Sequence, residues 1–182
     1  ERFRPAFEME LDAMRSVKHD YGLDNLQLMV PFCRTPEEGS LVTGLLNEKG
    51  VGPASGTDLF VMVELPSNVI EADRFIEMMD LSGGSIGSND LVQTVYAVSR
   101  DDLEGYQNPI DARSPSVKAM IRDIVGKFNS KGMEIGICGQ APSDFPDEFP
   151  AFLVDCGITS ISVTPDTAVA VRGTVAEAEK RA

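Results

Sequence analysis

The chain of 182 residues contains a single histidine, His19, and only three cysteines. His19 lies in the segment VKHDYG, at the end of a predicted surface helix and far from the ends of the predicted strands. Without a histidine in the site, catalysis by a Ser-His-Asp triad, Cys-His proteolysis and histidine-ligated zinc are excluded. Cys33, Cys138 and Cys156 have no metal-binding spacing, which favours a reduced, cytoplasmic setting.

Basic residues are also few, because 16 Lys and Arg stand against 29 Asp and Glu, for a formal net charge of −13. This balance argues against nucleic acid and against an anionic membrane as partners, since both require a basic surface. No apolar run approaches the roughly 18 residues that a transmembrane helix needs, and no secretory signal is present. The chain starts at Glu1 inside a helical pattern, so we expect it to be part of a larger protein.

The chain does contain a regular alternation of short apolar runs and helical patterns. The runs typical of strands cover residues 26–32, 59–65, 84–87, 133–139 and 158–165. Helical patterns cover residues 3–20, 35–50, 67–80, 89–100 and 114–132, a loop and helix follow in 140–157, and a last helix starts at 166. Thr35 and Ser67 are the predicted N-caps of the second and third helices.

The predicted strands are continuous apolar runs, which is typical of strands buried on both faces of a parallel α/β sheet. Two architectures fit this alternation, a doubly wound sheet and a (β/α)8 TIM-type barrel. A barrel of about 250 residues uses about 31 residues per unit, so five units and a leading helix match this length. No glycine-rich dinucleotide fingerprint follows any strand. We therefore predict that residues 1–182 form a single domain, a partial barrel made of about the last five βα units.

Polar or reactive residues follow every predicted strand. In a parallel barrel the carboxyl ends of the strands meet at one mouth, where function collects. The residues that follow the strands are Cys33 and Arg34; Glu64 and Ser67; Ser88, Asn89 and Asp90; Cys138, Gly139 and Gln140; Thr164 and Asp166. Two carboxylates, an arginine, an amide and a thiol among them would face one cavity, which favours an enzyme site.

Two of these residues, Glu64 and Asp90, could together hold a hard divalent cation. Mg²⁺ commonly takes one or two carboxylates and leaves its other positions to substrate and water. Helix capping is the alternative for Asp90, whereas Glu64 ends an apolar strand, where a carboxylate needs a partner. Cys138 is open to two interpretations, a small buried apolar residue or a reactive thiol. Cys33 and Cys156 are predicted to pack in the core.

Several motifs carry a resemblance to a known family. LMVPFCRTPEE, VMVELPSN, GSIGSNDLVQTVYAVSRDD and IGICGQAPSDFPDEFPAFLVDCGITSISVTPDT follow one another here in the order seen in the PEP-utilising enzyme family, where PEP is phosphoenolpyruvate. The resemblance covers nearly the whole chain and implies the C-terminal, PEP/pyruvate-binding part of a barrel. PFCRT and GQAPSD are most similar to members that convert ATP, pyruvate and water to PEP, AMP and phosphate. It further implies phosphohistidine and ATP-binding domains outside this chain.

The resemblance also implies roles for individual residues. Glu64 and Asp90 match the two Mg²⁺ ligands, and Cys138 matches the acid–base residue at C3 of the enolate. This family usually carries an aromatic residue where this chain has Gly84. The substrate-binding residues implied by the resemblance or by their place at a strand end are Asn89, Arg100, Gly139, Gln140, Ser88 and Arg34.

Two other functions stay open at this point. A Mg²⁺-dependent lyase or aldolase acting on 2-oxo acids would also need a carboxylate pair on this scaffold. A catalytically incomplete piece that acts only in assembly is the other alternative. Because five strands of an open barrel expose two sheet edges, which can pair with another chain, we expect a homo-oligomer.

Overall fold

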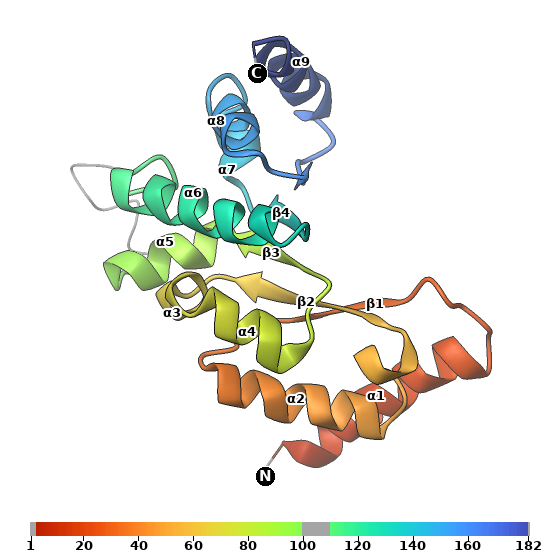
Figure 1. Ribbon diagram of the computed structural model, residues 1–182. Coiled ribbons are helices and arrows are strands. Elements are labelled where there is room, and N and C mark those ends of the chain that lie inside the picture. The colour runs from red at the N-terminus through yellow and green to blue at the C-terminus, as the bar shows by residue number, and fades with distance from the viewer. Residues whose placement is uncertain (1–2, 100–109, 182) are drawn as a thin grey trace.

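The computed structural model describes residues 3–99 and 110–181 (Figure 1). Arg100 therefore lies outside the described residues. Strands and helices alternate along the chain as the sequence predicts, with the following bounds: α1 Arg4–His19, β1 Gln27–Val30, α2 Pro36–Glu48, η1 Pro53–Ser55, β2 Asp58–Val63, α3 Pro66–Ile70, α4 Ala72–Met79, β3 Gly83–Gly87, α5 Ser88–Tyr96, α6 Pro115–Ser130, β4 Glu134–Cys138, α7 Ala141–Asp144, α8 Phe149–Cys156, β5 Ser160–Ile161 and α9 Ala168–Glu179.

The five described strands form one parallel sheet, and each strand pairs with the next strand along the chain. The register pairs Val61 of β2 with Gly84 of β3, and Ile86 of β3 with Ile137 of β4. A doubly wound sheet reverses its strand order at a switch point, and the described strands have no reversal. This topology confirms the predicted architecture, in which consecutive βα units form part of a barrel.

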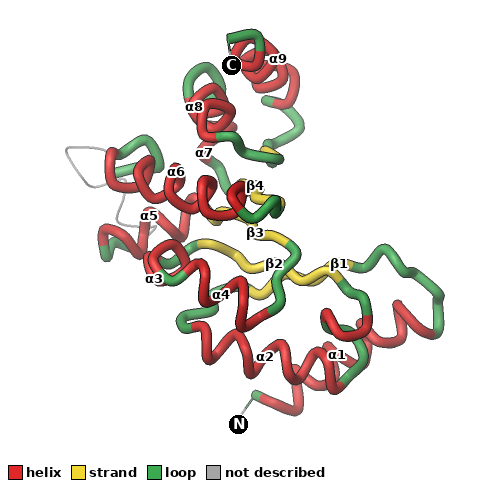
Figure 2. The backbone as a smooth tube through the Cα atoms, in the orientation of Figure 1, coloured by secondary structure: helices red, strands yellow, loops and turns green. Residues whose placement is uncertain are grey.

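Helices α2, α4 and α6 lie on one side of the sheet (Figure 2). Their buried side chains form one core with the strand residues that point toward them, such as Leu59, Ile86 and Ile137. Phe75 of α4 and Phe128 of α6 are each 1% exposed, and burying one such ring contributes roughly 1.5–3 kcal/mol. The sheet is therefore stabilised mainly from this side.

The opposite face of the sheet is only partly covered, which differs from the prediction of strands buried on both faces. Along β2, Leu59, Val61 and Val63 are buried, whereas Phe60 and Met62 between them are half-buried. The alternation arises because successive side chains of a strand point to opposite faces. On the face away from α2, α4 and α6, these side chains of β2 keep part of their surface exposed.

Of the two N-caps predicted from the sequence, Thr35 caps its helix and Ser67 does not. The Thr35 hydroxyl accepts a 3.2 Å hydrogen bond from the N–H of Glu38, as predicted for the N-cap of α2. Ser67 was predicted to cap the next helix, but α3 starts earlier, at Pro66, and Ser67 lies inside it. Asn68 accepts the hydrogen bond from the N–H of Leu65 instead, at 3.0 Å.

The predicted helix over residues 67–80 is two helices, α3 and α4, with a break at Glu71. At the break, the carbonyl oxygen of Val69 accepts a 2.7 Å hydrogen bond from Nζ of Lys127 in α6. In a continuous helix that oxygen would accept from the N–H four residues further on. The break also lets α4 turn its own apolar face, with Ala72 and Phe75, into the core.

The predicted strand over residues 158–165 is much shorter, since β5 consists of Ser160 and Ile161 only. Just before β5, Thr159 binds Ile135 of β4 through its main-chain N–H and also through its hydroxyl, which accepts from the N–H of Ile135 and donates to its carbonyl oxygen. Gly84, where the resemblance leads one to expect an aromatic residue, is buried against α6. A Cβ atom there would lie 3.1 Å from the ring of Phe128, so this ring fills the space beside the strand.

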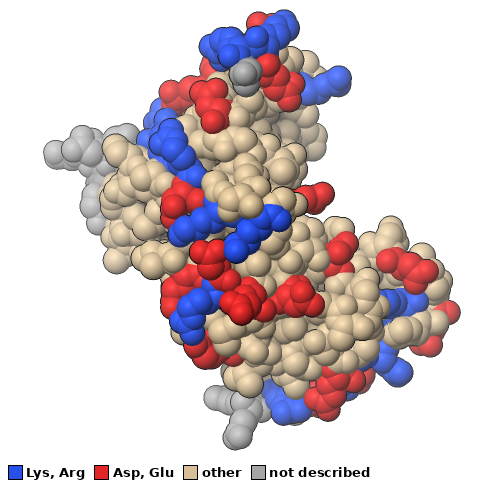
Figure 3. Space-filling model, in the orientation of Figure 1, with Lys and Arg blue, Asp and Glu red and all other residues tan. Residues whose placement is uncertain are grey.

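Basic and acidic side chains lie next to each other on the face shown in Figure 3. The ion pairs of the described residues include Lys131–Asp73 at 3.0 Å, which joins the end of α6 to α4. Arg74 of α4 pairs with both Glu71 and Glu37. Among the described helices, none has the length and apolar content required to cross a membrane.

Candidate active site

The carboxyl ends of β2, β3 and β4 bring the main candidate residues together. Val63 pairs with Ile86, and Gly87 pairs with Cys138. Glu64, which follows Val63, therefore lies beside Gly87 on one side, and Cys138 lies beside it on the other. Gly87 leaves room for this approach, because a Cβ atom there would lie 3.0 Å from Oε2 of Glu64 and 3.3 Å from Sδ of Met62.

Glu64 is a buried carboxylate, 3% exposed, held by the protein on one of its two oxygens. Its Oε1 accepts a 2.6 Å hydrogen bond from the N–H of Phe32. Burial raises the pKa of Glu64, the hydrogen bond from Phe32 lowers it, and the nearby negative charge of Asp90 raises it further, so that the net shift is upward. A cation between the two carboxylates would relieve this repulsion.

Asp90 lies in the first turn of α5, where its Oδ1 accepts a 2.8 Å hydrogen bond from Nε2 of Gln93. The described residues contain no group of three or more His, Cys, Asp and Glu side chains that could hold a metal ion. Glu64 and Asp90 are thus a pair of oxygen donors without a third acidic partner in residues 3–99 and 110–181. Such a pair fits Mg²⁺, which usually keeps several waters and one or two carboxylates.

The turn after β4 packs against the start of α5 through a set of amide and hydroxyl contacts. Ser88 is fully buried, and Asn89 and Gln140 bind each other twice: Nδ2 of Asn89 donates to Oε1 of Gln140, and the N–H of Gln140 donates to Oδ1 of Asn89, both at 3.3 Å. Gly139, with φ 101°, makes this approach possible, since a Cβ atom there would collide with the Ser88 hydroxyl. The structure thus brings together Ser88, Asn89, Gly139 and Gln140.

Cys138 differs from the two other cysteines in its surroundings. Its thiol is half-buried at the end of β4 and lies 3.6 Å from Sδ of Met62. Cys33 is 2% exposed, and burial raises its pKa to about 11. Cys156 packs against the core, and burial raises its pKa as well. Cys33 and Cys156 are therefore packing residues, as predicted, and Cys138 is the thiol that faces the site.

Arg34 and Thr164 bind residues outside this group, and His19 lies apart from it as predicted. The guanidinium of Arg34 is largely exposed, at 74%, and pairs with Glu38 at 2.7 Å. Thr164 reaches toward α7, where its N–H donates to the Ser143 hydroxyl at 2.9 Å. His19 lies at the opposite end of the sheet, since its Nε2 is 3.2 Å from the carbonyl oxygen of Gly50, in the connection before β2.

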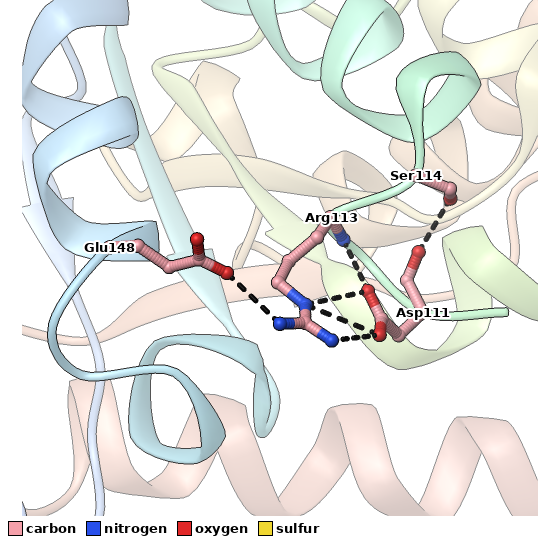
Figure 4. Close-up of polar contacts among 4 residues, drawn as sticks. All are labelled: Asp111, Arg113, Ser114 and Glu148. Atoms are coloured by element: carbon pink, nitrogen blue, oxygen red, sulfur yellow. Dashed lines mark hydrogen bonds and ion pairs between the residues drawn. The ribbon is translucent and has the colours of Figure 1, made fainter. Parts of the chain in front are cut away.

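A cavity of about 330 Å³ opens beside the Asn89–Gln140 pair, between α5 and α7. Its lining includes Phe145 and Asp111, whereas Glu64, Asp90 and Cys138 lie outside it. Figure 4 shows Arg113, which follows the lining residue Ala112 in the chain, with hydrogen bonds to Asp111 and to Glu148. The guanidinium of Arg113 also stacks on the ring of Phe145, 3.7 Å from its centre. Arg113 thereby joins the start of α6 to the α7–α8 segment.

Sequence reasoning missed three residues that hold Glu64 in place. The N–H of Phe32 binds its carboxylate, the side chain of Asn68 accepts from its N–H at 3.2 Å, and the Thr94 hydroxyl donates to its carbonyl oxygen at 2.8 Å. The only sequence signal was the position of Asn68, a capping residue type two positions after Pro66. The contacts of Phe32 and Thr94 depend on the tertiary fold.

Known proteins similar to this chain fall into two groups. A phosphoenolpyruvate synthase of Aquifex aeolicus is 44% identical over 180 residues, which cover 98% of this chain and 21% of that protein. A phosphoenolpyruvate synthase of Pseudomonas aeruginosa is 40% identical, with 100% of this chain and 23% of that protein covered. The chain thus spans between a fifth and a quarter of the length of these relatives.

The second group consists of solved structures that share the fold at low identity. The citrate lyase beta subunit of M. tuberculosis, complexed with oxaloacetate and magnesium, has a TM-score of 0.57 and 13% identity, over 82% of this chain and 60% of that chain. A citrate lyase of Burkholderia xenovorans has a TM-score of 0.59 and 15% identity, over 82% of this chain and 48% of that one. At this identity the likeness supports the barrel-type fold alone.

The family itself is identified by the sequence. The model of the family described as "PEP-utilising enzyme, PEP-binding domain" matches residues 1–180. Because this match extends over nearly the whole chain, and the relatives named above agree with it, the chain belongs to the PEP-utilising enzyme family and represents its PEP-binding domain.

Proposed function

We propose that this domain is the pyruvate half of a phosphotransferase that makes PEP by transferring a phosphoryl group from a phosphohistidine to the enolate of pyruvate. The overall reaction would convert ATP, pyruvate and water to PEP, AMP and phosphate. One observation carries the proposal: Glu64 and Cys138 flank Gly87 at the carboxyl ends of adjacent strands, with Asp90 and Asn89 at the start of the next helix.

Each of these side chains has a task that its chemistry allows. Glu64 and Asp90 would hold Mg²⁺, which as a Lewis acid stabilises negative charge on the substrate's oxygens. The thiol of Cys138 would move the proton at C3 of pyruvate. The amide of Asn89 would donate to a phosphoryl oxygen, and the main chain at Gly139 and Gln140 would line the same pocket. Ser88 would orient this turn. Arg100, outside the described residues, is the proposed phosphate contact, and Arg34 is a further proposed substrate contact.

The test of the site uses oxalate, a mimic of the pyruvate enolate. Thermal stability is measured with and without Mg²⁺ plus oxalate, on the wild type and on Glu64→Ala. A ligand that binds only the folded state, at 100 times its Kd, adds about 2.7 kcal/mol of stability. We expect a Mg²⁺-dependent shift in the wild type that Glu64→Ala loses, and an equal shift in both proteins would contradict the assignment of the ligand.

The test of the thiol is the exchange of the pyruvate methyl protons with solvent. Cys138→Ala should abolish this exchange while the shift produced by Mg²⁺ and oxalate persists. Exchange retained in Cys138→Ala would remove the thiol from the reaction. Cys156→Ala is the matched control, because Cys156 is another half-buried thiol but lies on α8.

A Mg²⁺-dependent lyase or aldolase acting on 2-oxo acids is the second candidate. It is favoured only by the fold shared with the citrate lyases, whereas the sequence similarity favours phosphoryl transfer. Direct assay of C–C bond cleavage in 2-oxo acids distinguishes the two. A domain that fails both this assay and proton exchange would instead act only in assembly.

We further propose that residues 1–182 act as one domain whose barrel is completed by other parts of a larger protein. The phosphohistidine and ATP-binding domains would lie in those parts. Within the described sheet, β1 and β5 each pair on one side only, and free edges favour association with a further chain. We therefore expect an oligomer in light scattering, and a monomer at working concentration would count against it.

A further inference from the structure

Asn68 makes three hydrogen bonds although it belongs to no predicted site. It is 2% exposed, and its Oδ1 accepts from the N–H groups of both Glu64 and Leu65, at 3.2 and 3.0 Å. Its Nδ2 donates a 2.7 Å hydrogen bond to the carbonyl oxygen of Cys33. The side chain thus satisfies main-chain groups of two strand-end turns that are 35 residues apart in the sequence.

A second hydrogen bond joins the same two turns, and its donor is Phe32, the residue before Cys33. The N–H of Phe32 donates to Oε1 of Glu64 at 2.6 Å, and Phe32 has a left-handed backbone with φ 47°. Non-glycine residues adopt this conformation only when the surroundings favour it. The two turns are therefore joined twice, by Phe32 to Glu64 and by Asn68 to Cys33.

The second carboxylate oxygen of Glu64, Oε2, lies on the side of the carboxylate that faces β3. Oε2 lies next to Gly87, where a Cβ atom would lie 3.0 Å from it. Asp90, whose charge acts on Glu64, lies three residues beyond Gly87 in α5. The fold thus gives the two oxygens of Glu64 different surroundings, a main-chain donor for Oε1 and the β3–α5 turn for Oε2.

We infer that Asn68 is a positioning residue, which fixes the β2–α3 turn so that Glu64 binds Phe32 through Oε1 and presents Oε2 alone to a divalent cation. The inference rests on the proposed function, because it concerns the cation that Glu64 and Asp90 would hold. Residues that orient a metal ligand commonly change metal affinity 10–100-fold when they are substituted.

The experiment measures the binding of Mn²⁺ alone, by the loss of its free EPR signal, in the full-length protein and its variants. Asn68→Ala should weaken Mn²⁺ binding about 10–100-fold. Thr43→Val is the matched control, because Thr43 is also a buried polar residue, 6% exposed. Its hydroxyl donates to the carbonyl oxygen of Met79, so this bond joins α2 to α4 and does not involve the strand-end turns. Thr43→Val should bind Mn²⁺ like the wild type.

Glu64→Gln separates this inference from the function on which it rests. Loss of binding in Glu64→Gln with unchanged binding in Asn68→Ala would overturn the positioning role and leave the cation site standing. Unchanged binding in Glu64→Gln would overturn both. A crystal structure of the wild type with Mn²⁺ gives a second measurement that does not depend on whether a variant folds. Coordination of Mn²⁺ through Oε2 of Glu64 alone supports the inference. Coordination through both carboxylate oxygens overturns it.

Discussion

The Ser88 hydroxyl donates a 3.0 Å hydrogen bond to the main-chain carbonyl oxygen of Cys138, so that the start of α5 is bonded to the end of β4. This bond holds together the turn that we propose to bind the phosphoryl group and the strand end that carries the Cys138 thiol. Gly139, the next residue along the chain, is the position at which this arrangement is most sensitive to substitution.

Gly139→Ala should destabilise the domain by about 1–3 kcal/mol, the usual cost of a side chain in a sparsely populated backbone conformation. Its φ of 101° disfavours any side chain, and the new methyl group would collide with the Ser88 hydroxyl. Urea unfolding measures the change. Gly44→Ala is the control, because Gly44 lies in α2 with nothing near its Cβ position, and alanine there should stabilise by roughly 0.5–1 kcal/mol. Equal effects at both positions would contradict the prediction.

Glu64→Gln should stabilise the domain at neutral pH in EDTA, by about 1 kcal/mol. Burial and the charge of Asp90 raise the pKa of Glu64, so stability is lost as the pH rises above the ordinary value of 4.5 and the carboxyl ionises in the folded state. Glutamine removes the charge and keeps an oxygen for the N–H of Phe32. In buffer with Mg²⁺ the wild type should be more stable than Glu64→Gln, because only the wild type gains stability from the cation. The same ranking in both buffers would argue against a cation site here.

Arg113→Met should change how stability depends on pH. Burial alone would raise the pKa of Asp111, but the hydrogen bonds and charge of Arg113 outweigh it and hold that pKa below the ordinary value of 3.8. The ion pair therefore stabilises the fold above pH 3.8 and loses its effect as the pH falls through the lowered pKa. The stability difference between wild type and variant, from urea unfolding, should shrink over that range.

Lys180→Met is the control for this experiment, because the Lys180–Glu177 pair is 69% exposed on both sides. Exposed pairs contribute little to stability, so this variant should follow the wild type at every pH. A wild-type advantage over Arg113→Met that stays constant down to acid pH would show that Arg113 acts through its contact with Phe145 instead.

Iodoacetamide should discriminate among the cysteines of the native protein. Cys33 is 2% exposed with a pKa raised to about 11, so almost none of it is a thiolate near neutral pH and it should react far more slowly than the half-buried Cys138. Mass spectrometry of timed samples measures the order of labelling. In urea the two rates should converge, and labelling of Cys33 first in the native protein would contradict the prediction.

The order of elements and the residues at the strand ends could be predicted from the sequence because both depend on local patterns. The apolar run before Glu64 and the Gly-Ser-Asn-Asp stretch after β3 marked the ends of neighbouring strands, and parallel pairing then brought them together. The break between α3 and α4 could not be predicted in this way, because Lys127, which binds the carbonyl oxygen of Val69 at the break, lies 58 residues further along the chain.

The role of Asn68 was hidden for a similar reason. Its residue type and its position after a proline suggested a helix cap and nothing more, whereas its bond to Cys33 exists only when β1 and β2 pair. The length of β5 was overestimated because the apolar pattern extends past the residues that pair with β4, which are Ser160 and Ile161.

The pairing of every described strand with its immediate successor has a consequence for how the protein forms during synthesis. Each described strand after β1 pairs with the strand made just before it, so the sheet can extend in chain order as the ribosome delivers the chain. Contacts between neighbours in sequence close small loops, which favours rapid folding.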